Sequence, residues 1–195
     1  MASISKNSIL IINAHPDKQS FCSSLAFAYF KGVDKSTDNR TLINLVDLDL
    51  DFKISPKNIK ELKPDVVFVQ KMLKNATHIV FVFPNWWGTY PAILKGFIDH
   101  IFIPDFAYKY QNNSQLPIPL LKGKSARLIM TMDTPVWYYS LYYKSPGLNS
   151  LKKSILNFCG IKPVKTTIFT SVKKSTEKKR KDWLKKIEEM GRKNQ

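Results

Sequence analysis

The sequence predicts an α/β fold in which a doubly wound, five-stranded parallel sheet carries helices on both faces. Short runs of β-branched and aromatic residues alternate along the chain with segments that have the 3.6-residue spacing of amphipathic helices. This alternation favours parallel pairing through helical crossovers. With 195 residues, of which 44% are hydrophobic, the chain is long enough for one well-packed domain that spans residues 1–195.

The first strand is predicted at Ser8–Asn13, where the central residues are wholly apolar. Ser20 is a good N-cap for a helix that runs to about Lys31, because its hydroxyl can accept from an unpaired backbone N–H. Gly32 and polar residues then end the helix. The second strand is predicted at Thr41–Val46.

The middle of the chain is predicted to form a helix, a strand and a second helix. Val66–Asn75 reads as a helix despite its valines, because a parallel sheet needs a crossover before the next strand. Ile79–Phe83 is an uninterrupted apolar run, typical of a strand that is buried on both faces. Pro91 has the fixed φ that suits a first helical turn, and apolar residues recur on one helical face from there to about Phe102.

The carboxyl-terminal part supplies two more strand and helix pairs. Ser125–Met132 and Lys165–Ser171 are the predicted fourth and fifth strands, and Leu148–Phe158 is the helix between them. Thr176 begins the closing helix, which is predicted to end near Arg192.

Four motifs stand in a definite order along this framework. They are ILIINAHPDKQSF, the FPNWW loop followed by PAILKGFIDH, then IFIPDFAYKY, and finally NFCGIKPV. Together they resemble the NAD(P)H:quinone oxidoreductase family, the DT-diaphorase-like branch of the flavodoxin-like fold. The resemblance spans roughly Ser8 to Val172 and implies the strand order 2-1-3-4-5.

The loop after the first strand is the candidate phosphate site. A helix N-terminus offers unpaired N–H groups and a partial positive charge, so an anion can bind there without an arginine. By resemblance, His15, Ser20 and Phe21 hold the phosphate region of a flavin, and Cys22 stands where the family often has Asn. The alternative is that Ser20 only caps the helix and His15 is an ordinary loop histidine.

The loop after the third strand is the candidate site for the flavin ring, because that ring needs aromatic contacts and polar donors at its edge. Pro84, Asn85, Trp86 and Trp87 occupy the flavin-flanking positions of the family. The alternative is that both tryptophans cap the core.

After the fourth strand the chain departs from the family. Where the family has T-T-G-G, this chain has Thr131, Met132, Asp133 and Thr134, which we still expect to face the polar edge of the flavin. The family also has a Tyr and a His that are proposed to relay charge. Tyr139 is the best match to that tyrosine and is the candidate catalytic residue, but no histidine follows residue 100, so the relay does not transfer.

Phe106, Tyr108 and Tyr110 alternate, which predicts an extended segment with the three rings on one side. By resemblance, they reach into the active site of a partner subunit and wall its quinone pocket, which implies a homodimer. The alternative is a loop packed on its own core. Asp99 and His100 diverge on a helix, so surface roles are expected for both, and His78 is expected to be structural.

Composition limits the other classes of function. The formal charge of +16 would attract nucleic acid, anionic membrane or phosphorylated cofactors, but lysine supplies nearly all of it, and specific phosphate or base recognition favours arginine. We therefore expect no nucleic-acid partner. The two cysteines read as buried reduced thiols, and no spacing indicates a metal site. Without a signal peptide or an apolar span, we expect a cytoplasmic protein with no membrane insertion.

The resemblance implies a flavoenzyme that takes hydride from NADPH or NADH and reduces quinones or similar acceptors by two electrons in a ping-pong sequence. FAD is favoured over FMN because FAYKY is most similar to FAD-binding members. Two alternatives stay open: a flavodoxin-like electron carrier, and a flavin-binding regulatory subunit of a potassium-efflux system. Such carriers are typically acidic, which disfavours the first.

Overall fold

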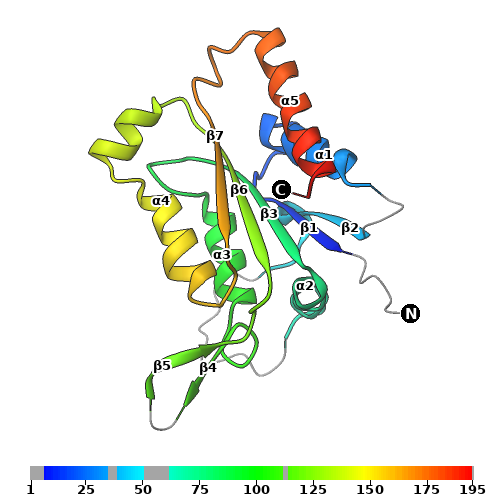
Figure 1. The fold of residues 1–195 in the computed structure, drawn as a ribbon, viewed down its shortest axis with the longest axis vertical. Coiled ribbons are helices and arrows are strands. Elements are labelled where there is room, and N and C mark those ends of the chain that lie inside the picture. Colours follow the sequence, from blue (N-terminus) through cyan, green and yellow to red (C-terminus); the bar gives the residue numbers. More distant parts are fainter. Residues whose placement is uncertain (1–6, 35–38, 51–61, 112–113, 195) are drawn as a thin grey trace.

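A computed structural model describes residues 7–34, 39–50, 62–111 and 114–194 (Figure 1). Its main sheet contains five strands: β1 (Ser8–Asn13), β2 (Asn39–Asn44), β3 (His78–Pro84), β6 (Ser125–Thr131) and β7 (Val164–Phe169). They run parallel in the order β2-β1-β3-β6-β7. When only the five strands of this sheet are numbered along the chain, their order is 2-1-3-4-5. The predicted fold class and strand order are therefore confirmed.

The register brings distant loops to one edge of the sheet. Asn13 at the end of β1 pairs with Asn44 on one side and Val82 on the other, and Pro84 pairs with Thr131. From β1 the chain adds the edge strand β2 on one side and then crosses to β3 on the other side of β1. Ligands of open α/β sheets bind outside the carboxyl ends of the strands at such a switch point.

Helices cover both faces of the sheet (Figure 1). On one face lie α1 (Phe21–Gly32) and α5 (Glu177–Arg192), and their apolar residues join those of one side of β1 in a buried cluster. The other face is covered by α2 (Pro64–Asn75), α3 (Ala92–Ile101) and a helical segment made of α4 (Pro146–Asn149) and η4 (Ser150–Asn157). Alternate residues of β1 therefore serve two separate cores, as expected of a doubly wound sheet.

Helices α1 and α5 approach each other through glycines. A Cβ added to Gly32 would lie 1.9 Å from the carbonyl oxygen of Glu188, and one added to Gly191 would lie 2.3 Å from that of Tyr29. Neither distance leaves room for a methyl group, so the close contact of the two backbones depends on these glycines.

The predicted elements agree with the structure apart from their ends. β2 begins and ends two residues before the predicted Thr41–Val46, and the chain continues as a short 3₁₀ turn, η1 (Leu45–Asp47). β7 ends before Ser171, whose left-handed backbone (φ 55°) is incompatible with a strand. Pro91 is the N-cap of α3 rather than a first-turn residue.

Two elements were not predicted. One is the antiparallel hairpin of β4 (Tyr108–Gln111) and β5 (Ser114–Pro119), which lies at the end of the molecule opposite the loops described above (Figure 1). The prolines of β5 hide its strand pattern, and prolines are tolerated there because the hairpin has free edges. The other is a single π-helical turn, η3 (Tyr138–Tyr142).

The expected surface role of His100 is wrong, whereas that of Asp99 is confirmed. His100 is buried, and its Nδ1 lies 2.7 Å from the carbonyl oxygen of Gly96, because the apolar face of α3 is wide enough to include it. Asp99 is exposed and pairs with Lys95 one turn earlier. The structural role of His78 fits its burial and its contact with Ser125.

The two cysteines are buried and form no disulfide bond, as predicted. Within the described ranges, no helix is long and apolar enough to cross a bilayer. The same residues contain no group of three potential metal ligands.

Candidate functional site

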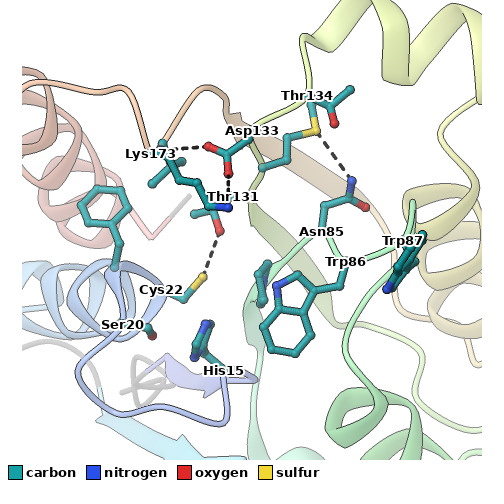
Figure 2. Close-up of a pocket in the computed structure, with 14 residues that line it drawn as sticks. His15, Ser20, Cys22, Asn85, Trp86, Trp87, Thr131, Asp133, Thr134 and Lys173 are labelled. Carbon is teal, nitrogen blue, oxygen red and sulfur yellow. Dashed lines mark hydrogen bonds and ion pairs between the residues drawn. The ribbon is translucent and has the colours of Figure 1, made fainter.

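A cavity of about 460 Å³ opens at the carboxyl edge of the sheet, between the loops that follow β1, β3, β6 and β7 (Figure 2). Every residue predicted to bind the cofactor lines it: His15, Ser20, Phe21, Cys22, Pro84, Asn85, Trp86, Trp87, Thr131, Met132, Asp133 and Thr134. Sequence reasoning missed two further lining residues, Val172 and Lys173, because the loop after β7 carries no motif that marks it.

The N-terminus of α1 presents backbone donors to this cavity. The Ser20 hydroxyl accepts from the N–H of Ser23 (3.2 Å) and so caps the helix. In the described part of the chain, the N–H groups of Phe21 and Cys22 donate to no other group. Two oriented donors at the positive end of a helix suit a phosphate. Ser20 is therefore a cap, and the same capped turn leaves donors for an anion.

His15 adds a side-chain donor beside these amides. Its Nδ1 accepts from the backbone N–H of Asp17 at 3.0 Å, so the proton of the neutral ring lies on Nε2. Burial lowers the pKa of His15, and Asp17 partly opposes the shift. The ring packs edge-on against Trp86 with centroids 5.5 Å apart, which connects the first loop to the aromatic loop.

The aromatic loop is a tight turn. Trp86 and Thr89 exchange two backbone hydrogen bonds of 2.8 and 3.0 Å, and the two central residues, Trp87 and Gly88, have φ values of 54° and 78°. Two positive φ values define a type I′ turn. Trp86 is 44% exposed and Trp87 fully exposed, so the alternative that both cap the core is wrong.

Asn85 ties the aromatic loop to the loop after β6. Its N–H donates to the carbonyl oxygen of Thr131 at 2.7 Å, and its side-chain Nδ2 lies 4.0 Å from the sulfur of Met132. The Oδ1 atom is buried without a hydrogen-bond partner among the described residues. A buried acceptor at a cavity wall is costly unless a donor arrives, so it fits a ligand with an N–H or O–H group at its edge.

Cys22 lines the cavity with a side chain that is almost fully buried, and it is no nucleophile. Its sulfur is 3.1 Å from the Thr131 hydroxyl, and burial raises the pKa of the thiol to about 12. A thiol with such a pKa stays protonated at neutral pH. The contact between Cys22 and Thr131 instead joins the first turn of α1 to the end of β6, which are 109 positions apart in the sequence.

Asp133 and Lys173 form one rim of the cavity. The Asp133 carboxylate accepts from the backbone N–H of Lys173 at 2.8 Å, and the Lys173 ammonium lies 3.8 Å from the other carboxylate oxygen (Figure 2). Both side chains are exposed, so this pair contributes little stability by itself. It does fix the loop after β7 against the loop after β6.

The structure does not bring Tyr139 into the cavity. Its ring is buried, and its hydroxyl donates to the carbonyl oxygen of Gly88 at 3.2 Å while it lies 3.4 Å from the N–H of Leu148. A catalytic group must reach the reacting atoms. The expected catalytic role therefore does not fit this placement, and the geometry gives Tyr139 the position of a support beneath the tryptophan turn.

The three residues expected to contact substrate also lie away from this chain's own cavity. Phe106 and Tyr108 pack partly against the core, whereas Tyr110 is exposed on β4. Phe106 lies in the turn before β4, so the three do not form one continuous strand. The ring of Tyr108 lies 5.5 Å from that of Tyr110 and 5.1 Å from that of Phe158, which sequence reasoning missed.

The chain is similar to known proteins in sequence and in fold. A family model described as flavodoxin-like fold matches residues 7–191. A Haemophilus influenzae protein named as an uncharacterized NAD(P)H oxidoreductase is 28% identical over 179 residues, which cover 88% of each chain. Human ribosyldihydronicotinamide dehydrogenase (quinone) is 26% identical over 203 residues, which cover 89% of this chain and 85% of the human protein.

Solved structures of other proteins have the same fold. A crystal structure from Streptococcus mutans superposes with a TM-score of 0.83 at 31% identity, covering 95% of this chain and 99% of that one. An FMN-dependent NADH-azoreductase from Bacillus anthracis, in complex with FMN, shares the fold with a TM-score of 0.74 at 21% identity, covering 96% of this chain and 99% of that one.

Proposed function

Because the chain belongs to the flavodoxin-like fold family, we propose that it is a flavin-dependent NAD(P)H oxidoreductase that reduces quinones or similar acceptors by two electrons. The proposal is carried by one observation, the convergence of a helix N-terminus, an aromatic turn and a polar loop on a single cavity. The names of the human and Haemophilus relatives support the same chemistry.

The phosphate end of the flavin would bind at α1. The N–H groups of Phe21 and Cys22 and the Nε2–H of His15 are donors at one place, and the helix adds its partial positive charge. A phosphate there would also favour the protonated form of His15, whose pKa is lowered by burial in the protein alone.

The ring end would lie against Trp86 and Trp87, with Asn85 and the loop after β6 at its polar edge. The buried, unpartnered Oδ1 of Asn85 is the feature that fits such an edge. When bound, a flavin supplies the hydride chemistry, namely acceptance from NAD(P)H and delivery to a second substrate. The residues of this chain bind and orient the ring and exclude water, and none of them has to act as nucleophile or metal ligand.

FAD is the proposed flavin, on the FAYKY resemblance, with FMN the alternative that the FMN-bound azoreductase supports. The proposal also includes a cytoplasmic homodimer. In it Phe106, Tyr108 and Tyr110 would contact the substrate of the partner subunit. The exposed ring of Tyr110 and the distance of the hairpin from its own cavity support that role (Figure 1).

The test is a visible absorption spectrum of the purified protein, before and after anaerobic addition of NADH or NADPH. We expect a yellow protein that bleaches within seconds and regains its colour with a soluble quinone, and heat release of the flavin identifies it. Asn85→Ala should weaken flavin binding, whereas Asn75→Ala, at the exposed end of α2, should not. A protein that takes up no flavin would refute the proposal, and colour without bleaching would indicate an electron carrier or a regulatory subunit.

A further inference from the structure

A fully buried asparagine lies at the end of β1 and takes no part in the site described above. Asn13 is 0% exposed and is not one of the residues that line the cavity. Directly after it comes the segment of residues 14–19, which we call the phosphate loop. A buried amide is costly unless its polar atoms are paired, so the partners of Asn13 show what it holds in place.

The hydrogen bonds of Asn13 fix the direction of its side-chain amide. The backbone N–H of His15 donates to Oδ1 at 3.3 Å, and because an N–H can only donate, the amide cannot be turned the other way. The nitrogen Nδ2 therefore faces Ser23 Oγ at 2.9 Å and Asn44 Oδ1 at 3.0 Å, with one hydrogen for each. One side chain thus joins the start of the phosphate loop, the first turn of α1 and the end of β2.

Ser23 connects Asn13 to the cap of α1. Its hydroxyl donates to the carbonyl oxygen of Asp17 at 3.0 Å, so the Ser20 hydroxyl is the donor in the 2.9 Å contact between the two serines. The Ser20 oxygen in turn accepts the N–H of Ser23. These bonds fix the first turn of α1, whose Phe21 and Cys22 amides are the proposed phosphate donors.

A second set of contacts holds the other side of the phosphate loop. Asn44 donates from Nδ2 to Asp47 Oδ2 at 3.3 Å, and Asp47 forms an ion pair with Lys18 of the phosphate loop. The contacts therefore form a closed cycle that returns to Asn13. Asp47 and Lys18 are exposed to water, which weakens their attraction, whereas the hydrogen bonds of the buried Asn13 are shielded from it.

We propose that Asn13 is a positioning residue for the phosphate of a bound flavin, an inference that rests on the proposed function. It holds His15 and the start of α1, which lie together at one end of the cavity (Figure 2), without touching the ligand. Donors that are fixed before binding lose little entropy when a phosphate arrives. An apolar side chain at position 13 would release all three partners, so the ligand would have to order the phosphate loop itself.

The test compares flavins that carry a phosphate with riboflavin, which has the same ring but no phosphate. In fluorescence titrations of the flavin-free full chain, Asn13→Leu should bind FMN and FAD about tenfold more weakly and riboflavin as the wild type does. Asn44→Ala removes one partner of Asn13 and should weaken FMN binding about threefold, again without a change for riboflavin. Because Asn44 is only partly buried, this variant tests the same contacts if Asn13→Leu does not fold.

Thr77→Val is the matched control at the opposite end of β1. The Thr77 hydroxyl accepts from the N–H of Ser8 and donates to its carbonyl oxygen, both at 3.2 Å. Its loss should lower stability but leave the affinities for FMN and riboflavin unchanged. A merely structural role of Asn13 predicts the same for both flavins. An equal loss of FMN and riboflavin binding in Asn13→Leu, or no loss of either, would therefore overturn the proposal.

Inorganic phosphate separates a failure of this proposal from a failure of the proposed function. Proton NMR of His15 in the flavin-free protein should show that phosphate raises the pKa of His15, which burial lowers, and that it does so less in Asn13→Leu. A wild type that shows this difference but binds no flavin would refute the flavoenzyme and retain Asn13 as the positioning residue of an anion site. A pKa that phosphate raises equally in both proteins, or in neither, would overturn the proposal.

Discussion

The buried imidazole of His78 should make the protein unstable in mild acid. Burial, reinforced by the positive charges of Arg127 and Lys165, lowers the pKa of His78 to about 4 in the folded protein. In the unfolded chain the pKa returns to about 6.5. Between these values the unfolded chain binds a proton that the folded chain does not, so stability falls as the pH falls. A gap of roughly 2.5 pH units, at about 1.4 kcal/mol per unit, corresponds to about 3.5 kcal/mol.

Urea unfolding followed by circular dichroism at pH 7, 6, 5 and 4.5 measures this loss, because ΔG of unfolding extrapolates linearly to water. His78→Gln should be less sensitive to acid than the wild type by most of that amount. Ser125→Ala is the matched control: it removes the hydroxyl that contacts the imidazole but keeps the titrating group, so it should lower stability at every pH and leave the acid sensitivity intact. Equal acid sensitivity in the wild type and His78→Gln would refute the reasoning.

Three further predictions concern the backbone contacts that support the fold and the site. Gly147→Ala would put a Cβ 2.7 Å from the Cα of Thr89 and displace the tryptophan turn, so a flavin titration should show affinity reduced by about tenfold or more, and unchanged affinity would contradict this. Tyr139→Phe should lower stability in urea by about 1 to 2 kcal/mol and change kcat little, whereas a fall in kcat of about 100-fold would restore its catalytic role. Gly32→Ala should destabilise by about 3 kcal/mol or more in thermal unfolding, because its Cβ meets the carbonyl of Glu188, and a normal melting temperature would show that the helices can separate there.

The fold could be predicted from the sequence because each strand and most helices carry their own periodicity. Ile79–Phe83 needs no partner to be recognised as a buried strand, and the apolar face of Pro91–Phe102 repeats on a helical period. The hairpin of β4 and β5 could not be predicted in full, because it is two-stranded and its pattern is interrupted by proline. The burial of His100 depends on how wide a face of α3 the core covers, which is a tertiary property.

In the candidate site, too, some residues could be predicted from local sequence whereas others depend on the tertiary structure. His15, the capped helix start and the tryptophan loop could be identified because they sit at the ends of recognisable strands, where the fold class itself predicts a ligand. Lys173 reaches the cavity only through the path of the loop after β7, and nothing local marks it. Tyr139 lies in a segment that departs from the family pattern, so its match to the family tyrosine rests on spacing alone. Its direction depends on the unpredicted turn η3, which points the ring into the core.

The backbone of Trp87 shows that folding does not favour this residue, so we propose that Trp87 is kept for ligand binding. A residue with a side chain pays about 1 to 2 kcal/mol to adopt its left-handed conformation, and the fully exposed indole recovers none of this by packing. Asn followed by Gly88 would form the same type I′ turn at less strain. A more thermostable protein is therefore one substitution away at Trp87→Asn, and the expected loss is in ligand binding. At this position, the stability of the fold and the proposed ligand site favour different residues.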